Sequence, residues 1–418
     1  MSPFFSRLAE RLRAQGHDAH RINLGFGDWL FWRSAGAHNY RGRKSNWPNY
    51  IDEFLKHQKV TDVILLGDCR HYHRIAIEKA NALGIEVTII ELGYLRPNWL
   101  TMERYGMSSL SHFPNDPKKI LAIAKEVEEV QPPEADNRPY FARMAFWDVL
   151  YKLSTVFLFW LYPFYKLHSL YHPFHEYSFW IARLLKKNKR EKKAAQIIDD
   201  LVANKQARPY FVYALQLNGD YQIRAHSPFE HQDGAIDLTF QSFKLNADEN
   251  AQIVVKQHPL DAGMNNWEQA VRRLAKENGI EDRVVFVDGG NLDLLLKNSL
   301  GLIVVNSTVG TSALSLNVPF ITLGAAIFDI EGLSFQGFID DFWSNRKPPD
   351  PILSAAFLKA LKATIQIPGG FYSDVAIAQA VEAASDKLLS RTVNGHNAYE
   401  ERPPRYKKKA SVEVSWLQ

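Results

Sequence analysis

Two apolar stretches in the second half of the sequence end abruptly in residues suited to bind an anion. In VVNSTVGTSAL (residues 304–314) the apolar run stops at an asparagine and continues into hydroxyl residues and a glycine. In VVKQHPLDAG (residues 254–263) it stops at a lysine, with a histidine and a proline close behind. Ligands of open α/β sheets bind beyond the carboxyl ends of strands, and helix N-termini bind anions through free amides. We therefore predict a nucleotide-binding site made of Lys256, His258, Pro259, Asn306, Ser307, Thr308, Gly310 and Ser312.

Each of these two signals also has an ordinary structural explanation. Ser307 or Thr308 could simply cap a helix that follows a strand, and a single histidine is more often structural than functional. No lysine follows Gly310, so this is not a Walker-type phosphate loop. In the functional interpretation, Gly310 would let a ligand approach the backbone closely.

Carboxylates at other strand ends are candidates for the chemical step. Asp220 follows the apolar run of YALQLNGD and could act as a base or a nucleophile, although Asn-Gly-Asp is also a common turn. In the first half, LLGDCRHYH (residues 65–73) and IIELGYLRP (residues 89–97) also end in polar groups. Glu91 is a second acid/base candidate. The predicted substrate-binding residues are Asp68, Arg70, His73, Tyr94 and Arg96, with structural ion pairs as the alternative.

The elements that must position these residues alternate between strand-like and helix-like patterns, which predicts an α/β fold with parallel, doubly wound sheets. With 418 residues, the chain is long enough for two such domains. We expect the first over residues 1–135 and the second, which would hold the nucleotide, over 206–350, with helices of 351–390 packing back and 391–418 forming a loose basic tail. The sequence opens on a helix pattern, although a doubly wound domain usually begins with a strand. The first domain is therefore either short by one strand or built without it.

Residues 139–205 are rich in Trp, Tyr and Phe and contain KKNKREKK (residues 186–193). Aromatic helices followed by basic residues suit the surface of an anionic membrane, and a helical segment that uses the aromatics as core is the alternative. The uncharged runs are too short to span a bilayer.

The single cysteine, Cys69, and the lack of a signal-peptide pattern favour a cytoplasmic protein. No spacing of Cys, His and carboxylates indicates a metal, and no basic stripe indicates nucleic acid.

Taken together, the motifs FGDWLF, GDCRHYH, GYLRPNWLTMERYG, QLNGDYQIRAHS, KQHPLDAG and VNSTVGTSALSLNVPFITLG resemble the bacterial capsule polysaccharide biosynthesis and export proteins of the KpsS/LipB type. The resemblance covers about residues 3–375. It implies a retaining β-Kdo transferase with two Rossmann-like domains of the GT-B kind and the aromatic helical insertion between them. CMP-Kdo would be the donor substrate, with no separate cofactor, and a phosphatidylglycerol or its lyso form the acceptor.

The resemblance also implies roles for individual residues. His258, Pro259, Ser307, Thr308 and Gly310 would hold the cytidine monophosphate, and Asp220 would be the catalytic nucleophile. The protein would sit peripherally on the inner face of the cytoplasmic membrane, in contact with other capsule assembly and export proteins. Family members have Glu-Glu where this chain has Glu91-Leu92, so the family's acid/base glutamate could be the missing second one. A non-catalytic export or assembly factor that binds the lipid-linked polysaccharide is the alternative function.

Overall fold

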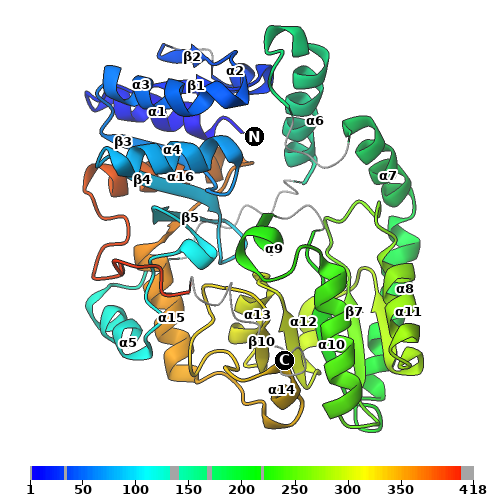
Figure 1. Cartoon of the computed structure of the whole chain (residues 1–418). Helices are drawn as coiled ribbons and strands as arrows, with labels where there is room; N and C mark the ends of the chain where they lie inside the picture. Colours follow the sequence, from blue (N-terminus) through cyan, green and yellow to red (C-terminus); the bar gives the residue numbers. More distant parts are fainter. Residues whose placement is uncertain (1, 33–34, 132–140, 167–171, 218–220, 406–418) are drawn as a thin grey trace.

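In the computed structural model, the described part of the chain excludes residues 1, 33–34, 132–140, 167–171, 218–220 and 406–418. It consists of two α/β halves stacked on each other, with helices α6 to α8 along one side (Figure 1). The predicted α/β fold is therefore confirmed, with mostly parallel sheets.

The sheet of the second half has five parallel strands in the order β10-β9-β6-β7-β8. Its strands are near-continuous apolar runs, as expected for a parallel sheet that is covered on both faces. Their bounds are β6 (Tyr210–Ala214), β7 (Gln252–Lys256), β8 (Val284–Val287), β9 (Gly301–Val304) and β10 (Phe320–Thr322). The helices of this half are α9 (Tyr221–His226), α10 (Gln232–Asn246), α11 (Trp267–Glu277), α12 (Leu292–Lys297), α13 (Val309–Ser315) and α14 (Ile339–Asn345).

The main sheet of the first half is mixed, with the order β11-β5-β4-β3. Strands β3 (Asp62–Leu66) and β4 (Glu86–Leu92) are parallel, but β5 (Trp99–Arg104) and β11 (Gln366–Pro368) each run antiparallel to their neighbour. The prediction of a purely parallel sheet is thus wrong here. No strand was predicted for WLTMER (residues 99–104), yet this segment folds back beside β4 through the tight connection of residues 93–98. Antiparallel strands need only such a short connection, whereas parallel strands need a long crossover.

The helices of the first half are α1 (Phe4–Ala14), α2 (Phe26–Phe31), α3 (Trp47–His57), α4 (His71–Ala82) and α5 (Pro117–Glu126). As expected, α1 precedes all described strands. Strands β1 (Arg21–Asn23) and β2 (Ala37–Asn39) form a separate two-stranded parallel sheet.

Two late helices return to the first half. Helix α15 (Pro351–Thr364) packs on α5, and α16 (Asp374–Leu389) packs on α1. The prediction of a loose tail is wrong for residues 391–405, because Arg405 is buried and donates hydrogen bonds to the carbonyls of Phe113 and Pro114. Residues 406–418 lie outside the described residues.

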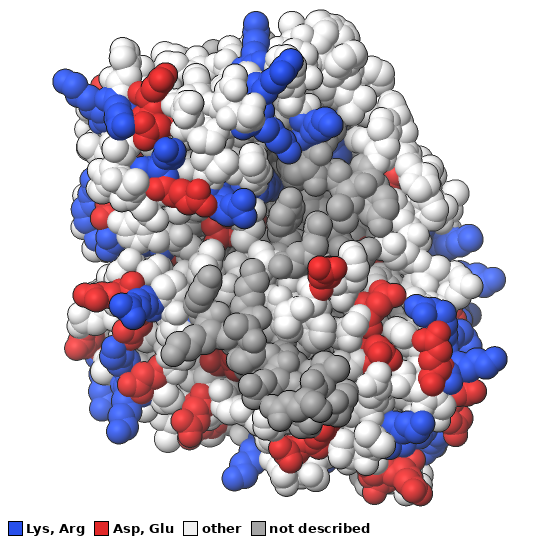
Figure 2. Space-filling model, viewed as in Figure 1, with Lys and Arg blue, Asp and Glu red and all other residues white. Residues whose placement is uncertain are grey.

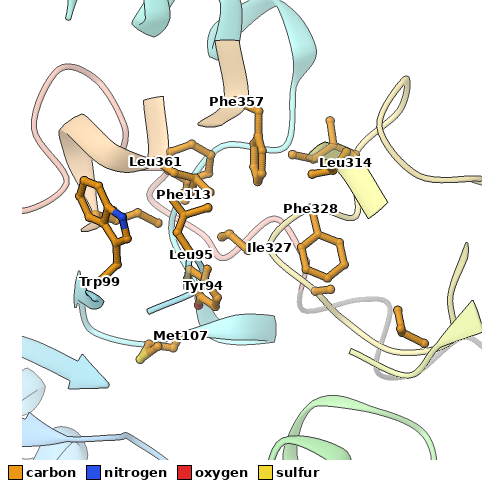
Figure 3. Close-up of a cluster of buried hydrophobic side chains, with 14 of the residues drawn as sticks. Tyr94, Leu95, Trp99, Met107, Phe113, Leu314, Ile327, Phe328, Phe357 and Leu361 are labelled. Carbon is orange, nitrogen blue, oxygen red and sulfur yellow. The ribbon is translucent and has the colours of Figure 1, made fainter. Parts of the chain in front are cut away.

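A shared apolar core joins the two halves. Tyr94, Leu95 and Phe113 from the first half pack with Leu314 and Phe328 from the second, as Figure 3 shows. Burial of this area stabilises one relative arrangement of the halves.

The aromatic segment forms α6 (Phe141–Phe157), α7 (Pro173–Leu185) and α8 (Lys187–Ala203). Helix α6 packs beside α2. Most of the exposed large apolar side chains of the described chain lie on this segment: Phe146, Phe157, Phe159, Trp160, Phe164, Phe174, Ile181, Leu184 and Leu185. Figure 2 shows that the surface over α6 and α7 is nearly free of charge. Among the described helices, none is long and apolar enough to cross a membrane.

Candidate functional site

The carboxyl ends of β7, β6 and β9 lie side by side, because these parallel strands are neighbours in the second sheet. Their order places β6 between the other two. The chain leaves β6 toward β7 and β8 on one side and toward β9 and β10 on the other. This is the topological switch point, where α/β sheets bind ligands. Lys256 ends β7 with His258 just beyond it, and Ser307 follows β9.

His258 is held as a neutral hydrogen-bond donor. Its Nδ1 accepts the backbone N–H of Leu260 at 3.1 Å, so the neutral ring carries its proton on Nε2. Burial lowers the pKa of His258 to about 4, helped by the charges of Arg96 and Lys256. The imidazole is therefore uncharged at pH 7 and offers Nε2–H to an acceptor.

The charge of Arg96 acts on His258 although the two residues belong to different halves of the structure. Arg96 belongs to the β4–β5 connection of the first half, and its side chain is exposed. Lys256 is buried in the second half, and burial lowers its pKa despite the nearby carboxylates of Asp288 and Glu191. The charges of Arg96, from the first half, and of Lys256 thus both act on His258, which sequence reasoning could not show.

In the serine-threonine turn, Ser307 and Gly310 both have structural roles. The Ser307 hydroxyl accepts the N–H of Val309, the first residue of the short helix α13, at 3.3 Å. Gly310 was expected to admit a ligand, but a Cβ there would lie 2.3 Å from the Phe328 ring. That expectation is wrong, because Gly310 is required for the packing of α13 on Phe328.

Asn306 also has a structural role, because it is hydrogen-bonded to Gln216. Its backbone N–H donates to the Gln216 side chain at 3.0 Å, and its Oδ1 accepts from Gln216 Nε2 at 2.8 Å. The pair ties the end of β9 to the end of β6. Pro259 is exposed next to His258, and Thr308 and Ser312 are half-buried on the turn and the following helix.

In the first half, Glu91 lies near the end of β4 with its carboxylate against Gly67, where a Cβ would lie 2.8 Å from Oε2. The structure places the residues predicted to bind substrate in different environments. Arg70 and His73 line a cavity within the first half, and His73 Nδ1 lies 2.9 Å from the Gly67 carbonyl. Asp68 is buried and accepts the N–H of Met107 at 2.9 Å.

Tyr94 is misassigned as a substrate-binding side chain. Its hydroxyl is buried, donates to Glu103 at 2.8 Å and accepts the N–H of Ser108 at 3.0 Å. Its carbonyl accepts the Thr311 hydroxyl of the second half at 3.3 Å. Tyr94 therefore joins the two halves from within the core. The predicted nucleophile, Asp220, lies outside the described residues.

Sequence reasoning missed a second interdomain contact around His226, which is fully buried. Its Nδ1 lies 2.7 Å from the Ser109 hydroxyl, and its Nε2 lies 3.1 Å from Cys69 Sγ. Cys69 Sγ also lies 2.9 Å from Asp68 Oδ1. Asp68, Cys69 and His226 form the group within the described chain whose spacing could hold a metal ion. Hydrogen bonds within the group account for the same geometry. Because its members are far apart in sequence, no local pattern could have indicated it.

Glu103 is a fully buried carboxyl group whose ionisation opposes folding. Burial raises its pKa to about 7, against hydrogen bonds from the hydroxyls of Ser111 and Tyr94. The folded state then holds a proton between pH 4.5 and 7 that the unfolded state has lost, so the free energy of unfolding falls as the pH rises through this window. Since one pKa unit is 1.36 kcal/mol, the fall is at most about 3 kcal/mol.

We expect Glu103→Gln to remove this fall, leaving the variant more stable than the parent at pH 8 and similar at pH 4.5. Urea unfolding at both pH values measures the difference, and the exposed Glu53→Gln is the control. A pH dependence unchanged by Glu103→Gln would show that another group is responsible.

Residues 61–372 match the family model described as capsule polysaccharide biosynthesis protein. The capsule polysaccharide export protein KpsS of Escherichia coli is 28% identical over 373 residues, covering 89% of this chain and 95% of KpsS. The capsule polysaccharide modification protein LipB of Neisseria meningitidis serogroup A is 30% identical over 376 residues, covering 89% of this chain and 90% of LipB.

Among solved structures, the KpsC β-Kdo 2,7 transferase of Thermosulfurimonas dismutans is similar at 15% identity and a TM-score of 0.43, covering 88% of this chain and 95% of that one. The family match extends over most of the chain and includes the ends of β3, β4, β6, β7 and β9. The chain belongs to the capsule polysaccharide biosynthesis protein family.

Proposed function

We propose that the protein is a glycosyltransferase that transfers β-Kdo from CMP-Kdo to a phosphatidylglycerol or lysophosphatidylglycerol acceptor and so starts the capsule linker. The observation that carries the proposal is the convergence of Arg96, Lys256 and His258 from two halves at a sheet switch point. Two cations and a neutral N–H donor suit a phosphate monoester such as that of CMP.

The proposed reaction retains the anomeric configuration in two steps. Asp220 attacks the anomeric carbon, the bond from that carbon to the phosphate oxygen breaks, and CMP leaves with the electron pair. Glu91 then takes the proton from an acceptor hydroxyl, which displaces the Asp220 carboxylate from the sugar. The nucleotide half would stabilise the departing phosphate, while the first half would present the acceptor and Glu91.

Binding of CMP tests the nucleotide site directly. We expect His258→Ala to weaken CMP binding about 10- to 100-fold in calorimetry, since a hydrogen bond to a charged group contributes about 1.5–3 kcal/mol. His57→Ala, which removes an exposed histidine of α3, should bind CMP like the parent. If the parent fails to bind CMP but binds anionic vesicles, the export-factor alternative replaces the transferase.

The lipid acceptor requires contact with a membrane, and the exposed aromatic side chains around α6 and α7 support that contact. Phe159 and Trp160 are 64% and 59% exposed, whereas Tyr151 and Tyr162 of the same segment are buried, so its aromatics serve partly as core and partly as an exposed surface. Exposed lysines at the start of α8 lie close by in sequence and can approach anionic headgroups. We propose peripheral attachment to the inner face of the cytoplasmic membrane through this surface, in reach of other capsule assembly and export proteins.

We expect the combined variant Phe159→Ser, Trp160→Ser and Phe164→Ser to bind phosphatidylglycerol vesicles at least about 10-fold more weakly, because less apolar area enters the interface. Co-sedimentation measures the loss. Leu245→Ser with Ile352→Ser is the matched control, since both side chains are 73% exposed and lie away from this segment. Equal losses in the two proteins would contradict a specific membrane surface.

A further inference from the structure

A cluster of three side chains that can bind a metal lies where the two halves of the chain meet. Asp68 and Cys69 belong to the connection between β3 and α4, and His226 is the last residue of α9 in the second half. Cys69 Sγ lies 2.9 Å from Asp68 Oδ1 and 3.1 Å from His226 Nε2. A carboxylate oxygen, a sulfur and a ring nitrogen thus lie within 4.8 Å of one another.

The atoms of Asp68 and His226 that face away from Cys69 are held by one segment of the first half, residues 107–109. The backbone N–H of Met107 donates to Asp68 Oδ2 at 2.9 Å, and the Ser109 hydroxyl lies 2.7 Å from His226 Nδ1. Asp68 Oδ1 and His226 Nε2 are thereby directed at the sulfur. Metal-binding side chains are commonly oriented by such hydrogen bonds to their other atoms, which fix the histidine ring and its tautomer.

The carboxylate of Asp68 is buried without a cation beside it. Asp68 is only 5% exposed, and His226 is fully buried. Among the described residues, no Lys or Arg forms an ion pair with Asp68, whose oxygens meet the Met107 N–H and the Cys69 thiol. A buried carboxylate that lacks a cationic partner costs free energy, and a cation bound at Oδ1 would offset that cost.

We propose that Asp68, Cys69 and His226 bind a divalent cation of borderline softness, with Zn²⁺ as the best fit, and that the bound ion links the two halves. Thiolate, imidazole and carboxylate are the ligand types that Zn²⁺ prefers, and water can take the fourth tetrahedral position. Tetrahedral Zn²⁺ needs about 3.6 Å between the sulfur and the other two ligand atoms. From the present 2.9 and 3.1 Å, the sulfur would shift by roughly 0.6 Å, which a small rotation of the half-buried Cys69 side chain provides.

Binding would exchange a proton for the metal. Without a metal, hydrogen bonds hold the three side chains together, and the Cys69 thiol donates to Asp68. On binding, the thiol proton passes to solvent and the sulfur becomes a thiolate ligand. Neutral His226 then carries its proton on Nδ1 and donates it to the Ser109 hydroxyl, and the 3.4 Å contact of the Ser109 N–H with Nδ1 is given up.

Cobalt binding tests the site in the whole chain, because the sequence contains a single cysteine. Co²⁺ is added to chelator-treated protein in the presence of a phosphine reductant, and the absorption spectrum is recorded. We expect a thiolate-to-cobalt charge-transfer band in the near ultraviolet, which only Cys69 can produce. Zn²⁺ should abolish the band by displacing Co²⁺, since thiolate-containing sites favour Zn²⁺.

Two substitutions distinguish metal ligation from folding. Ser109→Ala removes only the hydroxyl that orients His226 and should weaken Co²⁺ binding about 10- to 100-fold. Asp68→Asn keeps the shape of the side chain but removes its charge, and should weaken binding by at least the same factor. Ser45→Ala changes an exposed serine of the first half, so this control should bind Co²⁺ like the parent.

The link between the halves has its own measurements. At a 100-fold excess over its dissociation constant, Zn²⁺ should raise the melting temperature of the parent by about 3 °C and leave that of Cys69→Ser unchanged. In hydrogen exchange, Zn²⁺ should protect the peptides containing residues 66–72 and 221–227 together.

Absence of the charge-transfer band at saturating Co²⁺ would overturn the proposal, and so would a band that persists at parental affinity in both Asp68→Asn and Ser109→Ala. Protection of the peptide from the first half alone would show that His226 is not a ligand and would contradict the link. No nucleotide or sugar is present in these measurements, so their outcome is independent of whether the chain transfers Kdo.

Discussion

Asp220→Ala is expected to lower the rate of sugar transfer by at least about 10⁴-fold while leaving CMP binding intact. The reason lies in the position of Asp220 in the chain. Asp220 lies between the end of β6 at Ala214 and the start of α9 at Tyr221, and β6 is the middle strand between those that lead to His258 and Ser307. In the proposed reaction, the carboxylate of this connection attacks the anomeric carbon while the neighbouring strand ends hold the phosphate.

The assay mixes the purified protein with CMP-Kdo and a fluorescent phosphatidylglycerol. Asp233→Asn is the control, because it removes a half-exposed carboxylate on α10 that pairs with Arg273. Without acceptor, mass spectrometry should detect a Kdo adduct on the peptide containing Asp220 in the parent. Full activity of Asp220→Ala would refute the proposed nucleophile, and an inactive variant whose parent forms no adduct would assign Asp220 as a base instead.

Glu91→Gln should lower the transfer rate by about 100- to 1,000-fold, the usual contribution of general acid–base catalysis. Gln has nearly the same shape as Glu and can keep the contact with Gly67, so the fold should survive the substitution. The loss should appear in the turnover number rather than in the affinity for CMP, because Glu91 belongs to the half opposite the nucleotide site.

Glu103→Gln is a matched control for Glu91→Gln, since both glutamates lie in the β4–β5 pair and are directed at different partners. Glu103 is enclosed by Tyr94 and Ser111 and cannot reach a substrate, so its substitution should preserve activity. If Glu91→Gln kept the parental rate, the acid/base group would have to be another residue.

Sequence patterns predicted the strands correctly where the whole pattern lies within one segment. The apolar runs that became β3, β6, β7 and β9 are visible without a structure, because a parallel strand covered on both faces must be apolar along its length. WLTMER was missed because it has no such local mark, and its strand character comes from pairing with β4 and β11. Residues 391–405 were misjudged for a similar reason, since their polar composition hides the buried bonds of Arg405.

The sequence by itself determined the α/β class, the strand ends followed by His258 and Ser307, and the unusual aromatic segment. These features depend on residue type and spacing within one segment. Only the tertiary structure decided that Gly310 packs against Phe328, that the Tyr94 hydroxyl donates to Glu103, and that the charge of Arg96 acts on His258. Those outcomes depend on which distant segments meet, and packing across the two halves sets that choice.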